Sequence, residues 1–464
     1  MSDNGENQVI DLAERRAQKR EHFTDLGNAH RLIRCHGDDL RFVHEWGRWL
    51  CWDGRRWATD STDEIMRRAA AAVATIYQEA SELPEGEQRK KVASFASRSE
   101  SERGLRAMVA LAKTIEGVSV GMDELDQDPT LLNCENGTIN LETGKLYPHN
   151  RDDLITKMVP VEYRPDLRPK VFTAFLERIV PDPELRAFVQ RAVGYSLTGL
   201  TTEQVLFVIF GNGANGKSTL VELLHALLGD YFTKASPELL LAKKDSGIPS
   251  DVAALRGARL VAVTETEEGR RFAEVRVKEL VGGDHVSARH LYGEWFSFRP
   301  QAKFWIATNH KPRVRGTDDA IWRRLRLIPF EEKIDAAQRD LNMLEKLIAE
   351  LPAVLAWAVE GCLKWRRSGL NAPKAVTETT KEYRQGEDLI AGFLAECCAE
   401  GDDLWATSSD LFDAFRAWSG DRSTNRRVFS NRLQERGFKT IRVGHSRTRA
   451  WKGIGLLAEA GADQ

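Results

Sequence analysis

The sequence is poor in cysteine, in long apolar runs and in net charge, and each shortage excludes a class of protein. Its six cysteines include no Cys-x-x-Cys pair, so neither a disulfide framework nor a zinc ribbon is indicated. The longest apolar runs, such as residues 205–210, fall far short of the ~18 residues of a membrane span. The polar start MSDNGENQ lacks the apolar core of a signal peptide. We therefore expect a soluble protein of a reducing cytoplasm without membrane contact.

The charge balance excludes both a polyanion and a bulk polycation. The 67 lysine and arginine residues nearly balance the 69 acidic residues, and the formal net charge is -2. Any contact with nucleic acid must therefore come from local basic patches. A hydrophobic fraction of 42% over 464 residues is enough for several folded domains with buried cores.

Changes of composition along the chain predict six segments. A polar start is followed by a tryptophan-rich, mixed region with an Ala-rich helix at residues 65–80 and a small β-hairpin in CENGTINLETGKLYPHN. Strand, glycine loop, helix and further strands then predict an α/β nucleotide-binding core. The expected segments are a polar tail at 1–22, an α+β domain at 23–165, a helical segment at 166–202, the core at 203–350, a helix and polar linker at 351–388, and a last small unit at 389–464.

A phosphate-binding loop is the strongest motif. GNGANGKST fits G-x-x-x-x-G-K-[ST] and stands between the apolar run VLFVIF and the helical run STLVELLHALLG. In such a loop the amide groups and the helix N-terminus face the phosphates of ATP, the lysine reaches the β and γ phosphates, and the hydroxyl after it binds Mg²⁺. The expected ATP-binding residues are Gly211, Asn212, Gly213, Ala214, Asn215, Gly216, Lys217, Ser218 and Thr219.

Acidic partners for this loop follow the run ARLVAVT. Glu265 and Glu267 stand at or just past the carboxyl end of the expected strand, where a Mg²⁺ ligand and a water-activating carboxylate are needed. Their spacing leaves the division of roles open, with Glu265 the expected metal ligand beside Ser218. Glu268 remains a further candidate.

Two more features complete the expected site. The run KFWIAT is followed by Asn309, an amide suited to orienting the attacking water or contacting the γ phosphate. Arg323 and Arg324 lie further along, in IWRRLRLIPF. A permanently charged guanidinium can stabilise the transferring phosphate, often from a neighbouring subunit.

Taken together these residues resemble the helicase portion of the phage and plasmid primase-helicase family, which is related to the poxvirus primase-helicase. The resemblance extends over most of the chain, including NGTINLETGKLYPHN, GYSLTG, KELVGGDHVSARHLYGEWFSFRP, ATNHKP and WRRLRLIPF. It implies a superfamily 3 helicase of the AAA+ class: a hexameric ring that translocates 3′ to 5′ and unwinds DNA with ATP. Asn309 falls on the sensor asparagine and Arg324 on the arginine finger.

The resemblance also assigns the flanking regions. Residues 23–165 match the helicase-associated N-terminal domain and residues 166–202 a helical collar. Longer family members carry a primase-polymerase domain ahead of the helicase, whereas about 200 residues precede the P-loop here. We therefore expect no primer synthesis by this chain and a separate primase or polymerase as partner, in the cytoplasm of a bacterial host if a phage encodes it.

Two basic regions are expected to contact single-stranded and forked DNA. In superfamily 3 rings a hairpin like the alternating run at 286–298 points into the channel, so Arg289, His290 and the upstream Lys278 are candidates, with Tyr292 or Trp295 able to pack on sugars or bases. Core packing is the competing interpretation for Trp295, Phe296 and Phe298. Residues 421–452 carry ten lysines or arginines against two acids in a helix, helix, hairpin order that resembles a winged helix. Its expected DNA contacts are Arg426, Arg427, Arg432, Arg447 and Arg449.

Two other functions compete with the helicase. An origin-binding or ring-loading ATPase would share every motif but would not unwind DNA processively. A nucleotide kinase is disfavoured, because it does not require a sensor asparagine, an arginine pair and a basic C-terminal unit together.

Overall fold

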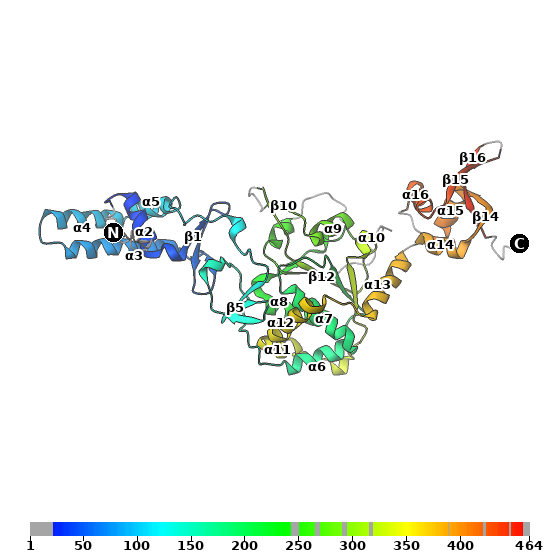
Figure 1. The fold of residues 1–464 in the computed structure, drawn as a ribbon, viewed down its shortest axis with the longest axis horizontal. Coiled ribbons are helices and arrows are strands. Elements are labelled where there is room, and N and C mark those ends of the chain that lie inside the picture. Colours follow the sequence, from blue (N-terminus) through cyan, green and yellow to red (C-terminus); the bar gives the residue numbers. More distant parts are fainter. Residues whose placement is uncertain are drawn as a thin grey trace, which may run out of the picture.

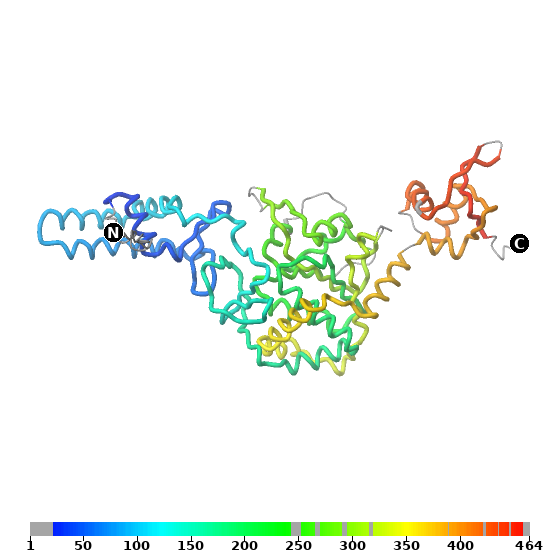
Figure 2. The backbone as a smooth tube through the Cα atoms, viewed as in Figure 1, coloured from blue at the N-terminus to red at the C-terminus, as the bar shows by residue number. Residues whose placement is uncertain are grey.

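The computed structural model describes residues 22–242, 250–264, 270–289, 295–314, 319–387, 389–420, 424–444 and 447–457. Three parts follow one another along the molecule, as Figures 1 and 2 show: a helical N-terminal part, a central parallel sheet with its helices, and a small C-terminal part. All but the last residue of the expected polar tail lies outside these ranges. Within them, every helix is too short or too polar to cross a bilayer.

The N-terminal part begins with four helices and a small antiparallel sheet. The first helix of the described residues, α2 (Asp25–His36), is capped by the Thr24 hydroxyl, which accepts a hydrogen bond from the Gly27 amide at 3.1 Å. The predicted Ala-rich helix is confirmed as α3 (Glu64–Glu82), whose buried face packs against the other helices. The remaining elements are α4 (Glu87–Ser99), α5 (Glu102–Ala112), β1 (Leu40–Val43), β2 (Arg48–Trp52) and β3 (Trp57–Thr59).

A second small sheet connects this part to the core. The predicted hairpin is confirmed as β4 (Leu131–Cys134) and β5 (Gly137–Asn140), and β6 (Lys145–Tyr147) adds a third antiparallel strand. The expected helical segment before the P-loop consists of α6 (Lys170–Ile179) and α7 (Pro183–Ser196).

Five parallel strands form the central sheet in the order β13-β7-β12-β9-β8. In β7 (Leu206–Phe210), Phe207 and Ile209 join the hydrophobic cluster on one face, whereas Leu206 and Val208 join the cluster on the other. Burial on both faces explains why the strand reads as an unbroken apolar run. The other strands are β8 (Phe232–Ala235), β9 (Leu260–Thr264), β12 (Lys303–Thr308) and β13 (Leu325–Pro329).

Helices cover both faces of this sheet. α8 (Lys217–Leu228) follows the P-loop, α9 (Glu274–Gly282) precedes the hairpin, and α10 (Asp319–Trp322) leads into β13. The close contact of α7 with α12 (Leu351–Ser368) depends on glycine, because a Cβ on Gly194 would lie 2.0 Å from the Cys362 nitrogen. The remaining elements are the hairpin strands β10 (Val286–Arg289) and β11 (Trp295–Phe298), and α11 (Met343–Ile348).

The polar linker expected at 371–388 is wrong. Most of that stretch is helix α13 (Lys374–Glu387), which packs along β13. One face of this polar helix packs on the core. Val376 and Tyr383 are buried there, and the Thr380 hydroxyl accepts a hydrogen bond from the Leu327 amide at 3.3 Å. Only two of its fourteen residues are buried, so the stretch has the polar overall composition of a linker although it is helical.

The C-terminal part has its own aromatic core, built from Phe393, Phe415, Phe429 and Trp451. Its two predicted helices and hairpin are confirmed, and a first helix and a long strand were not predicted. The elements are α14 (Leu389–Cys397), β14 (Cys398–Thr407), α15 (Ser408–Ser419), α16 (Arg426–Glu435), β15 (Lys439–Val443) and β16 (Thr448–Leu456), with sheet order β14-β16-β15.

Candidate nucleotide-binding site

The loop with the P-loop motif lies at the carboxyl end of β7, and close packing requires its glycines. A Cβ on Gly211 would lie 2.0 Å from the Phe330 carbonyl oxygen. Gly216 has φ +80°, and a Cβ there would lie 2.7 Å from Cγ2 of Ile179. Only glycine accommodates both the backbone conformation and the contact at Gly216.

Side-chain and backbone hydrogen bonds hold this loop against the segment that follows β13. The Asn215 amide nitrogen donates to the Phe330 carbonyl at 2.7 Å, and the Ile334 amide donates to the Ala214 carbonyl at 2.9 Å. Hydrogen bonds to residues outside the loop therefore stabilise its conformation in addition to its own turn.

Lys217 lies at the centre of the loop, and its ammonium group is held by three oxygens. Nζ donates to the Gly211 carbonyl at 2.6 Å, to Oδ1 of Asn215 at 2.9 Å and to Oδ1 of Asn309 at 3.1 Å. The residue is 5% exposed, and burial lowers the pKa of its ammonium below the usual range. The structure thus brings together the loop lysine and the polar residue after β12, two candidates 92 positions apart in sequence.

The other predicted loop residues differ in accessibility. Asn212, Gly213, Ala214 and Ser218 are exposed, while Thr219 is half-buried. The Ser218 hydroxyl in the first turn of α8 is thus accessible to a metal ion. Among the described residues, no group of three side chains is arranged to hold a metal ion.

The acidic candidates lie outside the described residues. Glu265, Glu267 and Glu268 follow directly on β9, which ends at Thr264. Since β12 lies between β7 and β9, the carboxyl ends of the three strands share one edge of the sheet, with Asn309 in the middle.

The two candidate arginines lie at the opposite side of the sheet from the P-loop, where the parallel strands begin. Arg324 precedes the first residue of β13, so the length of a five-residue strand separates it from the P-loop edge. It is 8% exposed, and its Nη1 donates to the Ala320 carbonyl at 2.6 Å, whereas its neighbour Arg323 is exposed. Neither arginine lines the cleft beside the P-loop.

Sequence reasoning missed Lys311, two residues beyond Asn309. It lines a cleft of about 610 Å³ beside the P-loop, together with Gly211, Asn212 and Asn309. Its Nζ lies 4.1 Å from the ring centroid of Phe210, the last residue of β7. The signal in the sequence was a lysine two residues after the sensor-like asparagine, in ATNHKPR.

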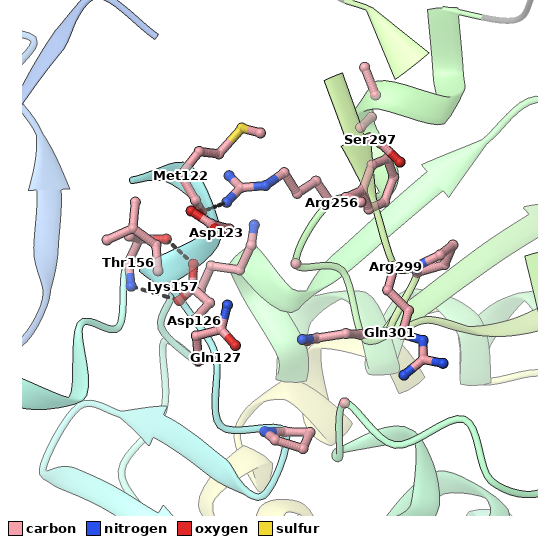
Figure 3. A pocket seen from close by; sticks show the side chains of 18 of the residues that line it. Met122, Asp123, Asp126, Gln127, Thr156, Lys157, Arg256, Ser297, Arg299 and Gln301 are labelled. Atoms are coloured by element: carbon pink, nitrogen blue, oxygen red, sulfur yellow. Dashed lines mark hydrogen bonds between the residues drawn. The ribbon is translucent and has the colours of Figure 1, made fainter. Parts of the chain in front are cut away.

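A larger cleft of about 1220 Å³ lies at the junction of the N-terminal part and the core, shown in Figure 3. Arg256 of the core donates to the Met122 carbonyl across that junction, and within the N-terminal part the Thr156 amide donates to Oδ1 of Asp126 at 2.8 Å. Lys157 donates to the Asp230 carbonyl at 3.1 Å. These contacts favour a structural joint over a ligand site.

The predicted hairpin is confirmed, and at its end Trp295 is exposed to solvent and does not pack in the core. Arg289 pairs across the strands with Trp295, and its guanidinium carbon lies 5.3 Å from the Trp295 ring centroid. Trp295 is 52% exposed, whereas Phe298 is buried, as alternation along a strand requires. Lys278 is half-buried on α9, and His290 and Tyr292 lie outside the described residues.

The basic residues of the C-terminal part are mostly open to solvent. Arg427, Arg447 and Arg449 are exposed, and Arg432 is half-buried. Arg426 is partly committed to α15, because its Nη2 lies 3.3 Å from Oδ1 of Asp413 and donates to the Ser409 hydroxyl at 3.1 Å. We therefore expect Arg427 to be more available to a phosphate than Arg426.

Comparison with known proteins supports this picture. Residues 29–189 match the family described as D5 N terminal like, and residues 209–324 match a family of unknown function, DUF5906. A provisionally named helicase of Acanthamoeba polyphaga mimivirus is 30% identical over 319 residues, which cover 63% of this chain and 33% of the relative. A provisionally named helicase of Frog virus 3 (isolate Goorha) is 27% identical over 307 residues, which cover 62% of this chain and 31% of the relative. A provisionally named primase of African swine fever virus is 28% identical over 212 residues, which cover 44% of this chain and 22% of the relative.

Among solved structures, the apo C-terminal region of NrS-1 aligns over 90% of this chain and 96% of that chain, with 11% identity and a TM-score of 0.46. A likeness at that level supports no inference. The sheet and the loop make the chain a mixed α/β protein with a P-loop motif at a parallel-strand edge. The chain carries a D5-like region and is similar to viral proteins that are named as helicases and primases. It spans about a third of the length of the first curated relatives it matches.

Proposed function

We propose that this chain is an ATP-dependent replicative DNA helicase of a phage or mobile genetic element, with a superfamily 3, AAA+-type core. The observation that carries the proposal is the contact of Lys217 with Asn309, which joins the P-loop to the end of the neighbouring strand β12. A γ phosphate that enters between them would meet a cation and an amide at once. The helicase names of the relatives favour DNA unwinding as the work done with ATP.

In this proposal ATP binds to residues 211–219 and Mg²⁺ binds to the Ser218 hydroxyl and to Glu265. Glu267, or else Glu268, activates the attacking water. Six subunits form a ring that moves 3′ to 5′ on one strand in the host cytoplasm, with primer synthesis left to a separate primase or polymerase. A hydrolysis site at the subunit boundary accounts for arginines that lie far from the P-loop of their own chain.

Strand displacement on forked DNA tests the function. The full chain with ATP and Mg²⁺ should release the labelled strand from a fork with a free 3′ tail. If ATP promotes assembly on DNA and no strand is released, the origin-binding or ring-loading function is the better account. If DNA does not affect hydrolysis at all, both functions are wrong.

The exposed hairpin tip provides a first prediction. Trp295→Ala should weaken binding of single-stranded DNA by about 5-fold to 100-fold, since stacking of one base on an aromatic ring contributes roughly 1–3 kcal/mol. Fluorescence anisotropy with an oligothymidine measures the effect. Trp295→Phe, which keeps a stacking face, serves as the matched control. Unchanged affinity in the alanine variant would remove the tip from the DNA interface.

The C-terminal part provides a second prediction. A chain that ends at residue 387, after α13, should keep its basal ATP hydrolysis, because every described P-loop contact lies before that point. Its DNA affinity should fall, and the slope of log K against log salt should become shallower by about 0.7–0.9 for each lost phosphate contact. Arg427→Ala in the full chain should lower the affinity for DNA of every sequence alike. Arg426→Ala should have a smaller effect. An unchanged salt slope would argue for a protein-docking role of this winged-helix-like unit.

A further inference from the structure

Lys311, at the edge of the nucleotide cleft, has no hydrogen-bond acceptor among the residues that the structure describes. Among the described residues it forms neither a hydrogen bond nor an ion pair, although Lys217, in the same region, donates to three oxygens. Its ammonium rests instead on two aromatic faces, at 4.1 Å from the ring centroid of Phe210 and 5.6 Å from that of Tyr383. Burial lowers its pKa, and the charges of Glu382 and Glu331 partly offset that effect.

The environment of the Lys311 ammonium favours the binding of an anion. Removal from water penalises the charge, and contact with aromatic faces compensates for less of that penalty than an ionic hydrogen bond in a partly desolvated site would. An oxygen anion that reaches this cleft therefore gains a strong partner without having to break an existing ion pair of the lysine. The anion expected beside a P-loop is a phosphate group.

The position of Lys311 indicates which phosphate it contacts. It stands two residues beyond Asn309, whose Oδ1 is bonded to Lys217, and both residues line the same cleft. The turn between them is held by the Thr308 hydroxyl, which donates to the His310 carbonyl at 2.7 Å and accepts from the His310 amide at 3.0 Å. Lys311 therefore lies on the side of the loop where the sensor-like asparagine would meet the terminal phosphate.

Helix α13 holds Lys311 in place. The Tyr383 hydroxyl donates to the carbonyl of Pro312, the residue after the lysine. One turn later the Val314 amide donates to Oε2 of Glu387 at 2.9 Å. α13 ends at Glu387 and the first helix of the C-terminal part, α14, begins at Leu389.

We infer that Lys311 is a second phosphate-binding cation, which contacts the terminal phosphate of a nucleoside triphosphate, and that Tyr383 of α13 is its positioning residue. The inference rests on the proposed function, because it assumes that the P-loop binds ATP. It adds a residue that distinguishes triphosphate from diphosphate. It also connects the nucleotide cleft to the helix that carries the C-terminal part.

Nucleotide affinities of full-length variants test the inference. Lys311→Met keeps an apolar stem against the Phe210 ring, so the fold should survive, as a melting curve will verify. Its affinity for the non-hydrolysable ATP analogue AMPPNP should fall about 10-fold or more, while its ADP affinity should change less than about twofold. Lys311→Arg should restore most of the preference for the triphosphate. Equal losses for both nucleotides, or no loss, would overturn the inference.

The positioning role of Tyr383 has a separate measurement. Tyr383→Phe keeps the ring under the ammonium but removes the hydroxyl that donates to the Pro312 carbonyl, and Tyr383→Leu removes both. The AMPPNP-to-ADP preference should therefore fall in the phenylalanine variant and fall further in the leucine variant. An equal preference in both variants would contradict the positioning role. A wild-type chain that binds no nucleotide would instead defeat the proposed function itself, so the two failures are distinguishable.

Discussion

Lys217→Ala is expected to lower ATP hydrolysis by at least about 100-fold and to abolish unwinding, on the scale of losing one preorganised electrostatic contact to a transition state. The wild-type ammonium is fixed by Gly211, Asn215 and Asn309, so it is already positioned where phosphate charge develops. Steady-state phosphate release measures the effect.

The fold should survive this substitution. Burial penalises the charged ammonium and lowers its pKa, so its loss removes a desolvation cost along with three hydrogen bonds. A melting temperature close to that of the parent, with hydrolysis lost, would be the expected pair of results. Hydrolysis at the parent rate would take the P-loop out of the mechanism.

Arg324→Ala is expected to lose about 10³-fold or more of its hydrolysis rate if the residue is an arginine finger. Because it lies at the sheet edge opposite the P-loop, it can only act on the nucleotide of a neighbouring subunit. Inactive Arg324→Ala subunits mixed with inactive Lys217→Ala subunits should therefore regain activity, since some interfaces would pair an intact loop with an intact arginine. Hydrolysis by the mixture, after co-assembly is demonstrated, is the measurement.

The burial of Arg324 makes Arg323→Ala the matched control. Arg324 is committed to the Ala320 carbonyl in its own subunit, while Arg323 is exposed and needs no rearrangement to reach a neighbour. If Arg323→Ala complements Lys217→Ala and Arg324→Ala does not, the finger is the exposed arginine and Arg324 stabilises the α10 turn. If no mixture recovers activity, neither arginine acts between subunits.

Local patterns predicted the elements whose signal is local. The P-loop, the strands at 260–264 and 303–308, the hairpin at 286–298 and the helices α15 and α16 follow from apolar runs, glycines and alternation over a few residues. The helix α13 was missed, since its packing face is sparse and its partner β13 lies elsewhere in the sequence. The sequence left Trp295 open between DNA contact and core packing, because alternation alone does not say which face of a hairpin is covered.

The sequence by itself determined the chemistry available to this protein: a P-loop on a buried strand, a polar residue after a later strand, and a basic final unit. Tertiary structure decided which of these groups meet. The order of parallel strands placed Asn309 against Lys217, put the arginine pair at the far edge, and brought α13 beside Lys311. The physical reason is that residues distant in sequence become neighbours only through sheet order and helix packing, which depend on burial over the whole core and not on any local pattern.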